Sequence, residues 1–259
     1  MADVVANGVR HHVQRLGTRV AGRPPVVFVH GLVMDNLSSF YFTLANPVAA
    51  RGEAILYDLR GHGMSERPPA RYAVADLVAD LAALLDALAI AEPVALVGNS
   101  FGGLLALAFA IAHPARVARI ALIDAHDGTD GWAAQMASTL GLQGDARDAK
   151  IGASFQAWLG RHSERKRTRL ATAAQALVEQ TSLIADLRAS PPLTGAQLAT
   201  IAAPTLALYG EQSDVVARGR ELARTLPRCE LVVLPGCTHS VLWEATAEVR
   251  ERVVAWVTA

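Results

Sequence analysis

The chain has 259 residues, 52% of them apolar, which is enough to bury the core of one large domain. Its 24 basic and 24 acidic residues cancel, so it lacks the basic balance of a typical nucleic-acid binder. Two cysteines in a chain of this length do not indicate a disulfide framework. Residues 1–10 lack a signal-peptide pattern, and the longest apolar run, 104–112, is too short to span a bilayer. We therefore expect a cytoplasmic protein that contacts neither nucleic acid nor membrane.

Short aliphatic runs alternate along the chain with longer segments of helical periodicity. Residues 9–20 suit a hairpin at a sheet edge. Runs typical of strands buried on both faces follow at 26–29, 54–57, 94–97, 120–123, 205–208 and 231–234. Residues 74–88 and 242–256 have apolar side chains at the spacing of one buried helical face. This alternation predicts an α/β fold with a mostly parallel sheet flanked by helices.

Residues 128–195 break this rhythm. They contain no strand-like run, and they end at the breaker Ser190-Pro191-Pro192. We expect a small helical cap here, inserted into a core formed by residues 1–127 and 196–259. A basic segment, 161–169, lies within it; this segment could meet an acidic substrate or a carrier protein, but a solvated helix face is the favoured interpretation.

A candidate nucleophile follows the run 94–97 directly. Gly98-Asn99-Ser100-Phe101-Gly102-Gly103 is a G-x-S-x-G motif between a predicted strand and a predicted helix, which is the context that this motif requires. The glycines allow a sharp turn that projects the Ser100 hydroxyl above the sheet. An ordinary glycine-rich turn is the alternative. A dinucleotide-binding turn is disfavoured, because its fingerprint needs glycine at the position of Ser100.

Two backbone N–H groups are candidates for an oxyanion hole. In the G-x-S-x-G arrangement, one donor is the residue after the nucleophile, here Phe101. The other comes from the loop after an earlier strand, where His30-Gly31-Leu32 follows residues 26–29, and we select Leu32. Gly31 would let this loop approach the substrate closely. His30 is interpreted as a brace for the loop.

A base and an acid should follow the serine in chain order, with the acid first. His239 comes after the last predicted strand and is the only histidine after Asp214, so we expect it to act as the general base. Asp214 and Asp124 both follow strand-like runs, and either could reach the carboxyl edge of the sheet. We favour Asp214 as the carboxylate that orients the imidazole.

These motifs together resemble the α/β-hydrolase superfamily. The resemblance covers residues 20–125 and 200–259, and residues 58–65 add its D-x-R-G-x-G-x-S loop, in which Asp58 and Arg60 would pin a turn. Within the superfamily, the chain resembles above all the cofactor-free serine branch, which includes carbon–carbon bond hydrolases, haloperoxidase-like esterases and lactonases. Related epoxide hydrolases and haloalkane dehalogenases carry aspartate where Ser100 stands. The resemblance implies a serine hydrolase without a cofactor and with a variable cap.

Substrate contacts are harder to predict than the catalytic residues. The larger apolar side chains of the predicted cap either line a pocket or pack the cap onto the core, and a further wall could come from the 40–42 segment; the candidates are Phe40, Trp132, Met136, Phe155 and Trp158. No H-E-x-x-H or C-x-x-C motif is present, so no metal is expected.

The sequence thus predicts a hydrolase that cleaves an ester, thioester, lactone or activated carbon–carbon bond of a small apolar substrate through an acyl-Ser100 intermediate. A carrier-bound acyl thioester is within this range. A lyase or acyltransferase with the same residues is one alternative, and a non-catalytic ligand-binding protein is another, because fold alone does not decide among them.

Overall fold

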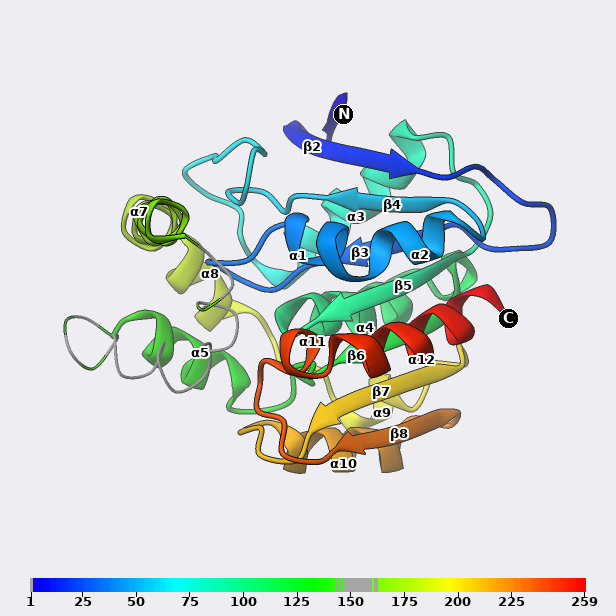
Figure 1. Ribbon diagram of the computed structural model, residues 1–259. Coiled ribbons are helices and arrows are strands. Elements are labelled where there is room, and N and C mark those ends of the chain that lie inside the picture. Colours follow the sequence, from blue (N-terminus) through cyan, green and yellow to red (C-terminus); the bar gives the residue numbers. More distant parts are fainter. Residues whose placement is uncertain (1, 143, 145, 147–159, 161–162) are drawn as a thin grey trace.

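The computed structural model describes residues 2–142, 144, 146, 160 and 163–259. Eight strands form one sheet in the order β1-β2-β4-β3-β5-β6-β7-β8 (Figure 1). The strands are β1 (Ala2–Ala6), β2 (Val9–Leu16), β3 (Val26–Val29), β4 (Ala54–Tyr57), β5 (Val94–Asn99), β6 (Val117–Ile123), β7 (Thr205–Gly210) and β8 (Cys229–Leu234). Strands β3 to β8 are mutually parallel, and β2 is antiparallel to both of its neighbours. The prediction of a mostly parallel sheet flanked by helices is confirmed.

The hairpin at the sheet edge lies earlier than predicted. Residues 9–16 form the single strand β2. Its partner in the hairpin is the earlier strand β1, and residues 17–20 do not belong to a strand. The turn between them is Asn7-Gly8, both with positive φ (49° and 76°). This Asn-Gly turn is a strong hairpin signal that the sequence analysis passed over.

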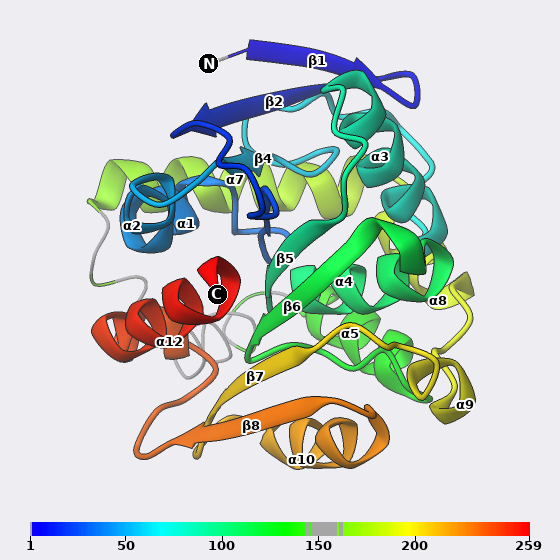
Figure 2. The ribbon, with the colours of Figure 1, turned by 90° about the vertical axis from the view of Figure 1, so that its right-hand side faces the viewer.

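Helices cover both faces of the sheet, as Figure 2 shows. One face packs against α3 (Val74–Ala87), α4 (Phe101–Ala112) and α10 (Val216–Thr225). The other packs against α1 (Ser38–Phe40), the π-helix η1 (Tyr41–Ala45), α2 (Asn46–Ala49), α11 (Val241–Glu244) and α12 (Thr246–Thr258). Within β3, Val27 and Val29 face the first layer while Val26 and Phe28 face the second. All four residues of β3 are buried, and this strand is apolar at every position because both of its faces are covered.

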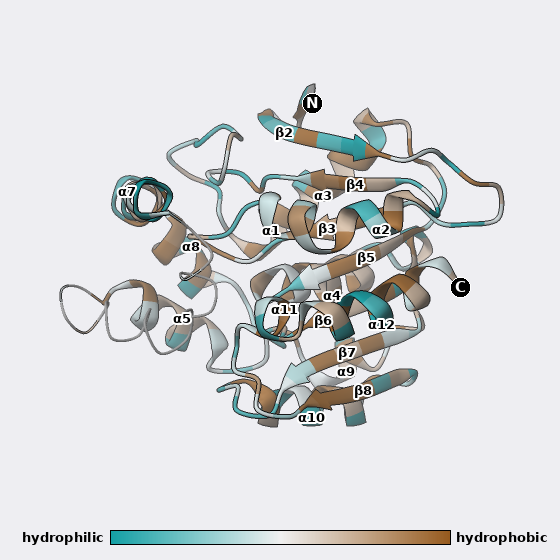
Figure 3. Ribbon diagram, viewed as in Figure 1, coloured by the Kyte–Doolittle hydropathy of each residue, from teal (hydrophilic) through white to brown (hydrophobic). Residues whose placement is uncertain are grey.

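Three further helices lie beyond the carboxyl ends of the parallel strands: α5 (Trp132–Leu140), α7 (Glu164–Gln180) and α8 (Leu183–Ala189). Leu177 on α7 is 1% exposed, and a Cβ placed on Gly61 would lie 2.6 Å from its Cδ1. The rest of α7 is largely polar (Figure 3), with Arg165, Arg167 and Arg169 exposed and Lys166 Nζ 5.8 Å from the Phe42 ring centroid. Thus α7 presents a basic outer face, as predicted for the described part of 161–169.

The remaining described helices are the 3₁₀ turn η2 (Pro114–Arg116) and α9 (Gly195–Leu198), which begins with a capping box formed by Thr194 and Gln197. None of the helices among the described residues is both long and apolar enough to cross a bilayer.

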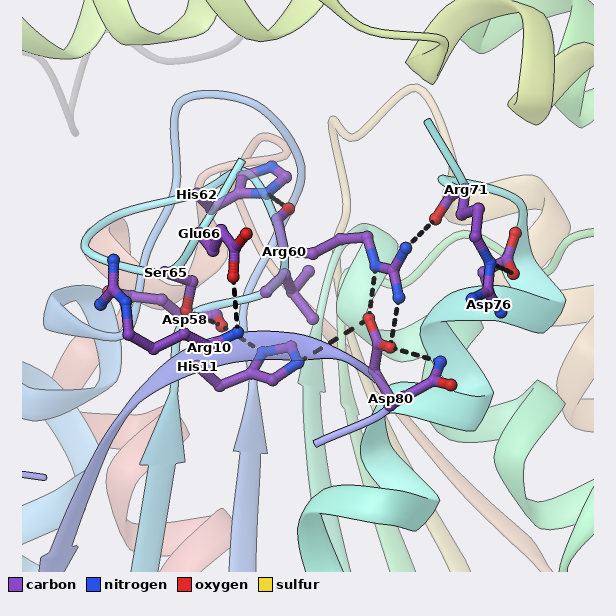
Figure 4. A network of polar contacts seen from close by, with 12 residues as sticks. Arg10, His11, Asp58, Arg60, His62, Ser65, Glu66, Arg71, Asp76 and Asp80 are labelled. Carbon is purple, nitrogen blue, oxygen red and sulfur yellow. Dashed lines mark hydrogen bonds and ion pairs between the residues drawn. The ribbon is translucent and has the colours of Figure 1, made fainter. Parts of the chain in front are cut away.

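A buried ion pair ties the 58–65 segment to α3 and the N-terminal hairpin (Figure 4). Arg60 donates from Nε to Asp80 Oδ2 at 2.6 Å and from Nη2 to the other carboxylate oxygen. Both residues are 1% exposed. Asn7 donates to Asp80 Oδ1 at 2.8 Å, and His11 Nε2 lies 3.9 Å from Asp80 Oδ2. Burial of a charged pair requires this dense set of partners.

Candidate active site

Ser100 occupies a sharp turn between β5 and α4. Its backbone has φ 53° and ψ −118°, a conformation that a non-glycine residue adopts only at a cost. The Ser100 N–H donates to the Ile123 carbonyl at 2.9 Å, and the Ser100 carbonyl accepts the Gly103 N–H at 3.0 Å. These bonds fix the turn, so the serine is held at the carboxyl edge of the sheet and at the start of α4.

The two glycines of the motif are needed for this turn to close. A Cβ on Gly102 would lie 1.9 Å from the Val29 carbonyl oxygen, and one on Gly98 would lie 2.5 Å from the Gly102 carbonyl oxygen. Neither backbone neighbour can move away without disturbing the sheet or the helix. The structure thus agrees with the steric reason given for these glycines from the sequence.

Ser100 and His239 are directly connected. Ser100 Oγ lies 3.0 Å from His239 Nε2, although the two residues are 139 positions apart. His239 follows β8, and its side chain is 10% exposed. Its Nδ1 lies 2.6 Å from Asp124 Oδ2. Because a carboxylate only accepts, Nδ1 carries the proton and Nε2 is free to accept the serine proton.

Asp124 is fully buried at the end of β6, with φ 45°. Its Oδ1 accepts the Gly210 N–H at 2.8 Å, and its Oδ2 accepts the Ser213 hydroxyl in addition to His239. Donors from the end of β7 and from the turn after it therefore fix the carboxylate against the imidazole. A carboxylate in this position holds an imidazole in one tautomer and one orientation.

Asp214 does not occupy the position that the sequence analysis gave it. Its side chain is exposed, whereas the neighbouring Ser213 is 6% exposed and points to Asp124. Asp124, the alternative carboxylate, lies against His239 instead. The reason is the sheet order: β6 is next to β5, and Asn99 pairs with Ile123, so the residues after both strands lie side by side.

The loop after β3 lies beside Ser100. A Cβ on Gly31 would lie 3.5 Å from Ser100 Cβ. The Gly31 N–H donates to Asp35 Oδ2 at 2.7 Å, and Ser39 donates its hydroxyl to Asp35 Oδ1. Leu32 follows Gly31 in this loop, and Phe101 is the first residue of α4. Of the two predicted oxyanion donors, Leu32 therefore follows a residue that lies beside Ser100, and Phe101 follows Ser100 itself.

Two buried histidines connect this loop to residues 58–65. His30 Nδ1 lies 2.7 Å from the Gly31 carbonyl oxygen, and His30 Nε2 accepts the Leu59 N–H at 3.0 Å. His62 Nδ1 lies 2.8 Å from the Arg60 carbonyl oxygen, and His62 Nε2 accepts the Val33 N–H at 2.7 Å. Each ring therefore donates from Nδ1 and accepts at Nε2, as a neutral imidazole does. His30 does brace the loop, as the sequence analysis interpreted it.

Burial lowers the pKa of His62 to about 3, and the nearby His30 lowers it further in the same direction. An unfolded histidine has a pKa of about 6.5, so between pH 6.5 and 3 the unfolded chain binds the additional proton. The stability that neutral His62 contributes is therefore complete above about pH 6.5 and is lost as the pH falls towards 3.

We expect the free energy of unfolding to fall with decreasing pH in this window, by up to about 1.4 kcal/mol per pH unit from this residue alone. Urea titrations at several pH values between 7.5 and 4.5 measure the slope. In His62→Gln the free energy of unfolding should depend less steeply on pH. Burial also lowers the pKa of His11, but this contribution is the same in both proteins and does not affect the comparison. Equal slopes in the two proteins would contradict this origin.

A second histidine, which the sequence analysis did not single out, lies beside His239. The His126 and His239 ring centroids are 5.6 Å apart, and the His126 N–H donates to the Ser100 carbonyl at 3.2 Å. Trp132 lies 6.0 Å from His126 and stacks on Phe101 at 5.8 Å. The available signal was position: His126 follows Asp124 by two residues at the same edge of the sheet.

The predicted substrate contacts have different fates. Phe40 is fully buried, 4.9 Å from the Phe28 ring, so it belongs to the core and not to a pocket wall; this prediction is corrected. Trp132 is 4% exposed in the stack just described, and Met136 is half-buried against the same core cluster. Phe155 and Trp158 lie outside the described residues.

Among the residues that the structure describes, no cluster of three or more His, Cys, Asp or Glu side chains could hold a metal ion.

Comparison with known families decides the relationship. The family model described as alpha/beta hydrolase fold matches residues 24–246. The chain belongs to the α/β-hydrolase family. The resemblance drawn from the motifs is therefore confirmed at the level of the family.

Individual α/β-hydrolases show similar sequence and structure. A 2-hydroxy-6-oxo-2,4-heptadienoate hydrolase of Pseudomonas putida is 40% identical over 124 residues, 47% of this chain and 43% of that protein, so the match spans less than half of either. The enol-lactonase from Burkholderia xenovorans LB400 has 26% identity and a TM-score of 0.79 over 100% of both chains. The meta-cleavage product hydrolase from Pseudomonas fluorescens IP01, at 21% identity, has the same fold, with a TM-score of 0.77 over 99% of this chain and 97% of that one.

Proposed function

We propose that this protein is a serine hydrolase with a Ser100–His239–Asp124 triad. The observation that carries this proposal is the continuous hydrogen-bonded path from Ser100 Oγ to His239 Nε2 at 3.0 Å and from His239 Nδ1 to Asp124 Oδ2 at 2.6 Å. A protein that only binds a ligand has no need for such a path.

Acylation begins when Ser100 Oγ attacks the electrophilic carbon and His239 Nε2 takes the hydroxyl proton. The negative charge on the substrate oxygen is stabilised by the N–H groups of Leu32 and Phe101. His239 then returns the proton to the leaving group, and the acyl group remains on Ser100. Asp124 stabilises the imidazolium throughout and stays ionised. Water, deprotonated by His239, attacks the acyl carbon; Ser100 leaves with the proton from His239, and the acid is released.

The substrate class that we propose is a small apolar ester, thioester, lactone or activated carbon–carbon compound. The similarity to the enol-lactonase supports a lactone or ester, and the partial match to the heptadienoate hydrolase supports carbon–carbon cleavage. All of these pass through the same acyl-serine step, and the carbon–carbon case requires His239 to protonate a carbon leaving group. Helices α5, α7 and α8 lie beyond the serine-bearing edge and form the proposed cap over the substrate.

A fluorophosphonate probe tests the activated serine directly. We expect one adduct per wild-type chain by intact mass and none on Ser100→Ala, with labelling of His239→Ala slowed by more than about 100-fold because the general base is absent. Ser138→Ala, at an exposed serine of α5, is the matched control and should label fully.

Two outcomes would count against the proposal. Folded wild-type protein that does not react with the probe and does not turn over a small ester would exclude an assembled serine site. If labelling and turnover are present, hydrolysis in heavy-oxygen water must place one solvent oxygen in the acid product. A product without it would indicate a lyase or a transferase that uses the same residues.

A further inference from the structure

Leu32 is held from both sides by hydrogen bonds of its neighbours. On one side, the carbonyl of Gly31 accepts from His30 Nδ1 at 2.7 Å. Because the peptide is planar and trans, the Leu32 N–H in the same plane points away from that carbonyl. On the other side, the N–H of Val33 donates to His62 Nε2 at 2.7 Å. The peptides on both sides of Leu32 are thus each bonded to a buried histidine, His30 on one side and His62 on the other.

Val33 is strained. Its φ is +65°, and a β-branched side chain in the left-handed region is a genuine outlier that persists only when its surroundings hold it. The described hydrogen bond that holds its backbone N–H is the one to His62. A second bond, from the Met34 N–H to the Leu32 carbonyl at 2.9 Å, closes the turn around Val33. Without the His62 bond, this short turn would carry the strain at Val33 with one bond fewer, and we expect Val33 to relax towards the extended region and the preceding peptide to turn with it.

His62 itself is part of a rigid platform (Figure 4). Asp58 Oδ2 accepts the Met64 N–H at 2.8 Å, Asp58 Oδ1 accepts the Leu37 N–H at 2.8 Å, and Ser65 donates its hydroxyl to the Asp58 carbonyl at 2.6 Å. Arg60, whose carbonyl accepts from His62, is anchored by Asp80. The imidazole can therefore hold a strained neighbour without moving itself.

We propose that His62 is a positioning residue for the oxyanion hole: it holds the strained Val33 backbone, and so keeps the Leu32 N–H directed at the substrate oxygen. This inference rests on the proposed serine hydrolase function. It assigns to the D-x-R-G-x-G-x-S loop a role in transition-state stabilisation, through the x between its two glycines, in addition to the structural role of Asp58 and Arg60.

A matched pair of variants separates the two bonds of the imidazole. An asparagine amide reaches the position of Nδ1 and can still donate to the Arg60 carbonyl, but it is too short to reach Val33. A glutamine oxygen reaches the position of Nε2 and can accept the Val33 N–H. We expect His62→Asn to lower kcat on an aryl ester by about 10- to 100-fold with little change in KM, since a misplaced oxyanion donor is lost in the transition state only. His62→Gln should stay within about 3-fold of wild type.

The diagnostic readout is the ratio of kcat/KM for an aryl ester to kcat/KM for the thionoester that differs only in C=S for C=O. The larger sulfur is a weaker acceptor and gains less from the oxyanion donors, so this ratio reports the donors and does not change with the fraction of folded enzyme. His62→Asn should lower the ratio by about 10-fold or more, whereas His62→Gln should keep it. Adding Val33→Gly to His62→Asn should restore part of the ratio, because glycine at φ +65° carries no strain.

The assignment would be overturned if His62→Asn lowered kcat/KM equally for the ester and the thionoester, or if it behaved like His62→Gln. Unfolding measurements on each variant confirm that the compared proteins are folded, and His62→Asn/Val33→Gly provides a second test from the other partner of the bond. A wild type that lacks Ser100-dependent turnover of the aryl ester would instead overturn the proposed function, and this inference with it.

Discussion

Replacing Asp124 with asparagine should lower kcat by about 10⁴-fold, whereas the same change at Asp214 should leave it within about 3-fold. An amide at position 124 would donate to His239 Nδ1 and favour the tautomer with the proton on Nε2. That nitrogen then donates to Ser100 and cannot accept its proton. The kcat values for steady-state hydrolysis of an aryl ester by both variants and the wild type measure the difference.

The Asp214→Asn variant is the matched control, because both changes remove one carboxylate from a turn at the same edge of the sheet. Thermal unfolding of both variants separates lost activity from lost structure. Since Asp124 also accepts from Gly210 and Ser213, some loss of stability is expected there. If Asp214→Asn abolished turnover and Asp124→Asn did not, the contact between Asp124 and His239 would not be the one used in catalysis.

Replacing Asp80 with alanine should lower the free energy of unfolding by about 3–5 kcal/mol. The change leaves the guanidinium of Arg60, 1% exposed, without its carboxylate partner. Asn7 loses the same partner. Urea unfolding at pH 7.5 measures the loss.

Asp86→Ala is the control on the same helix, since Asp86 pairs with Arg116 at 2.9 Å but is 68% exposed. A solvent-exposed pair contributes less than about 1 kcal/mol, so this variant should remain close to wild type. Similar losses in both variants would show that the buried pair has no special weight. An Arg60→Met/Asp80→Leu variant should recover much of the loss, because removing both charges leaves neither one unpaired.

The sheet and the strand–turn–helix unit that carries Ser100 could be predicted because short sequence patterns mark them. An aliphatic run marked each of the six parallel strands, because strands covered by helices on both faces are rich in apolar residues. Ser100 was predicted as a candidate nucleophile from the G-x-S-x-G motif. The structure places a steric limit at each of its glycines, the nearby Gly102 carbonyl for Gly98 and the Val29 carbonyl, distant in sequence, for Gly102.

The carboxylate that contacts His239 could not be predicted in the same way, because it depends on a choice between two distant turns. Asp124 and Asp214 are equivalent in sequence terms: each follows a buried strand at the same edge. The outcome depends on which side chain of the 213–214 pair turns inward, and Ser213 does. Pairing of Asn99 with Ile123 would have favoured Asp124, but the register between β5 and β6 is known only from the structure.

The three residues of the proposed triad follow β5, β6 and β8, and the contacts that join them span 115 and 139 positions. No shorter portion of the chain can bring a serine, an imidazole and a carboxylate together, because His239 lies beyond the last strand. During synthesis or refolding the nucleophile would therefore stay unreactive until the C-terminal strand has docked on β7. With the proposed triad, this order would leave partly folded intermediates without an activated serine, and the appearance of serine reactivity would mark completion of the sheet.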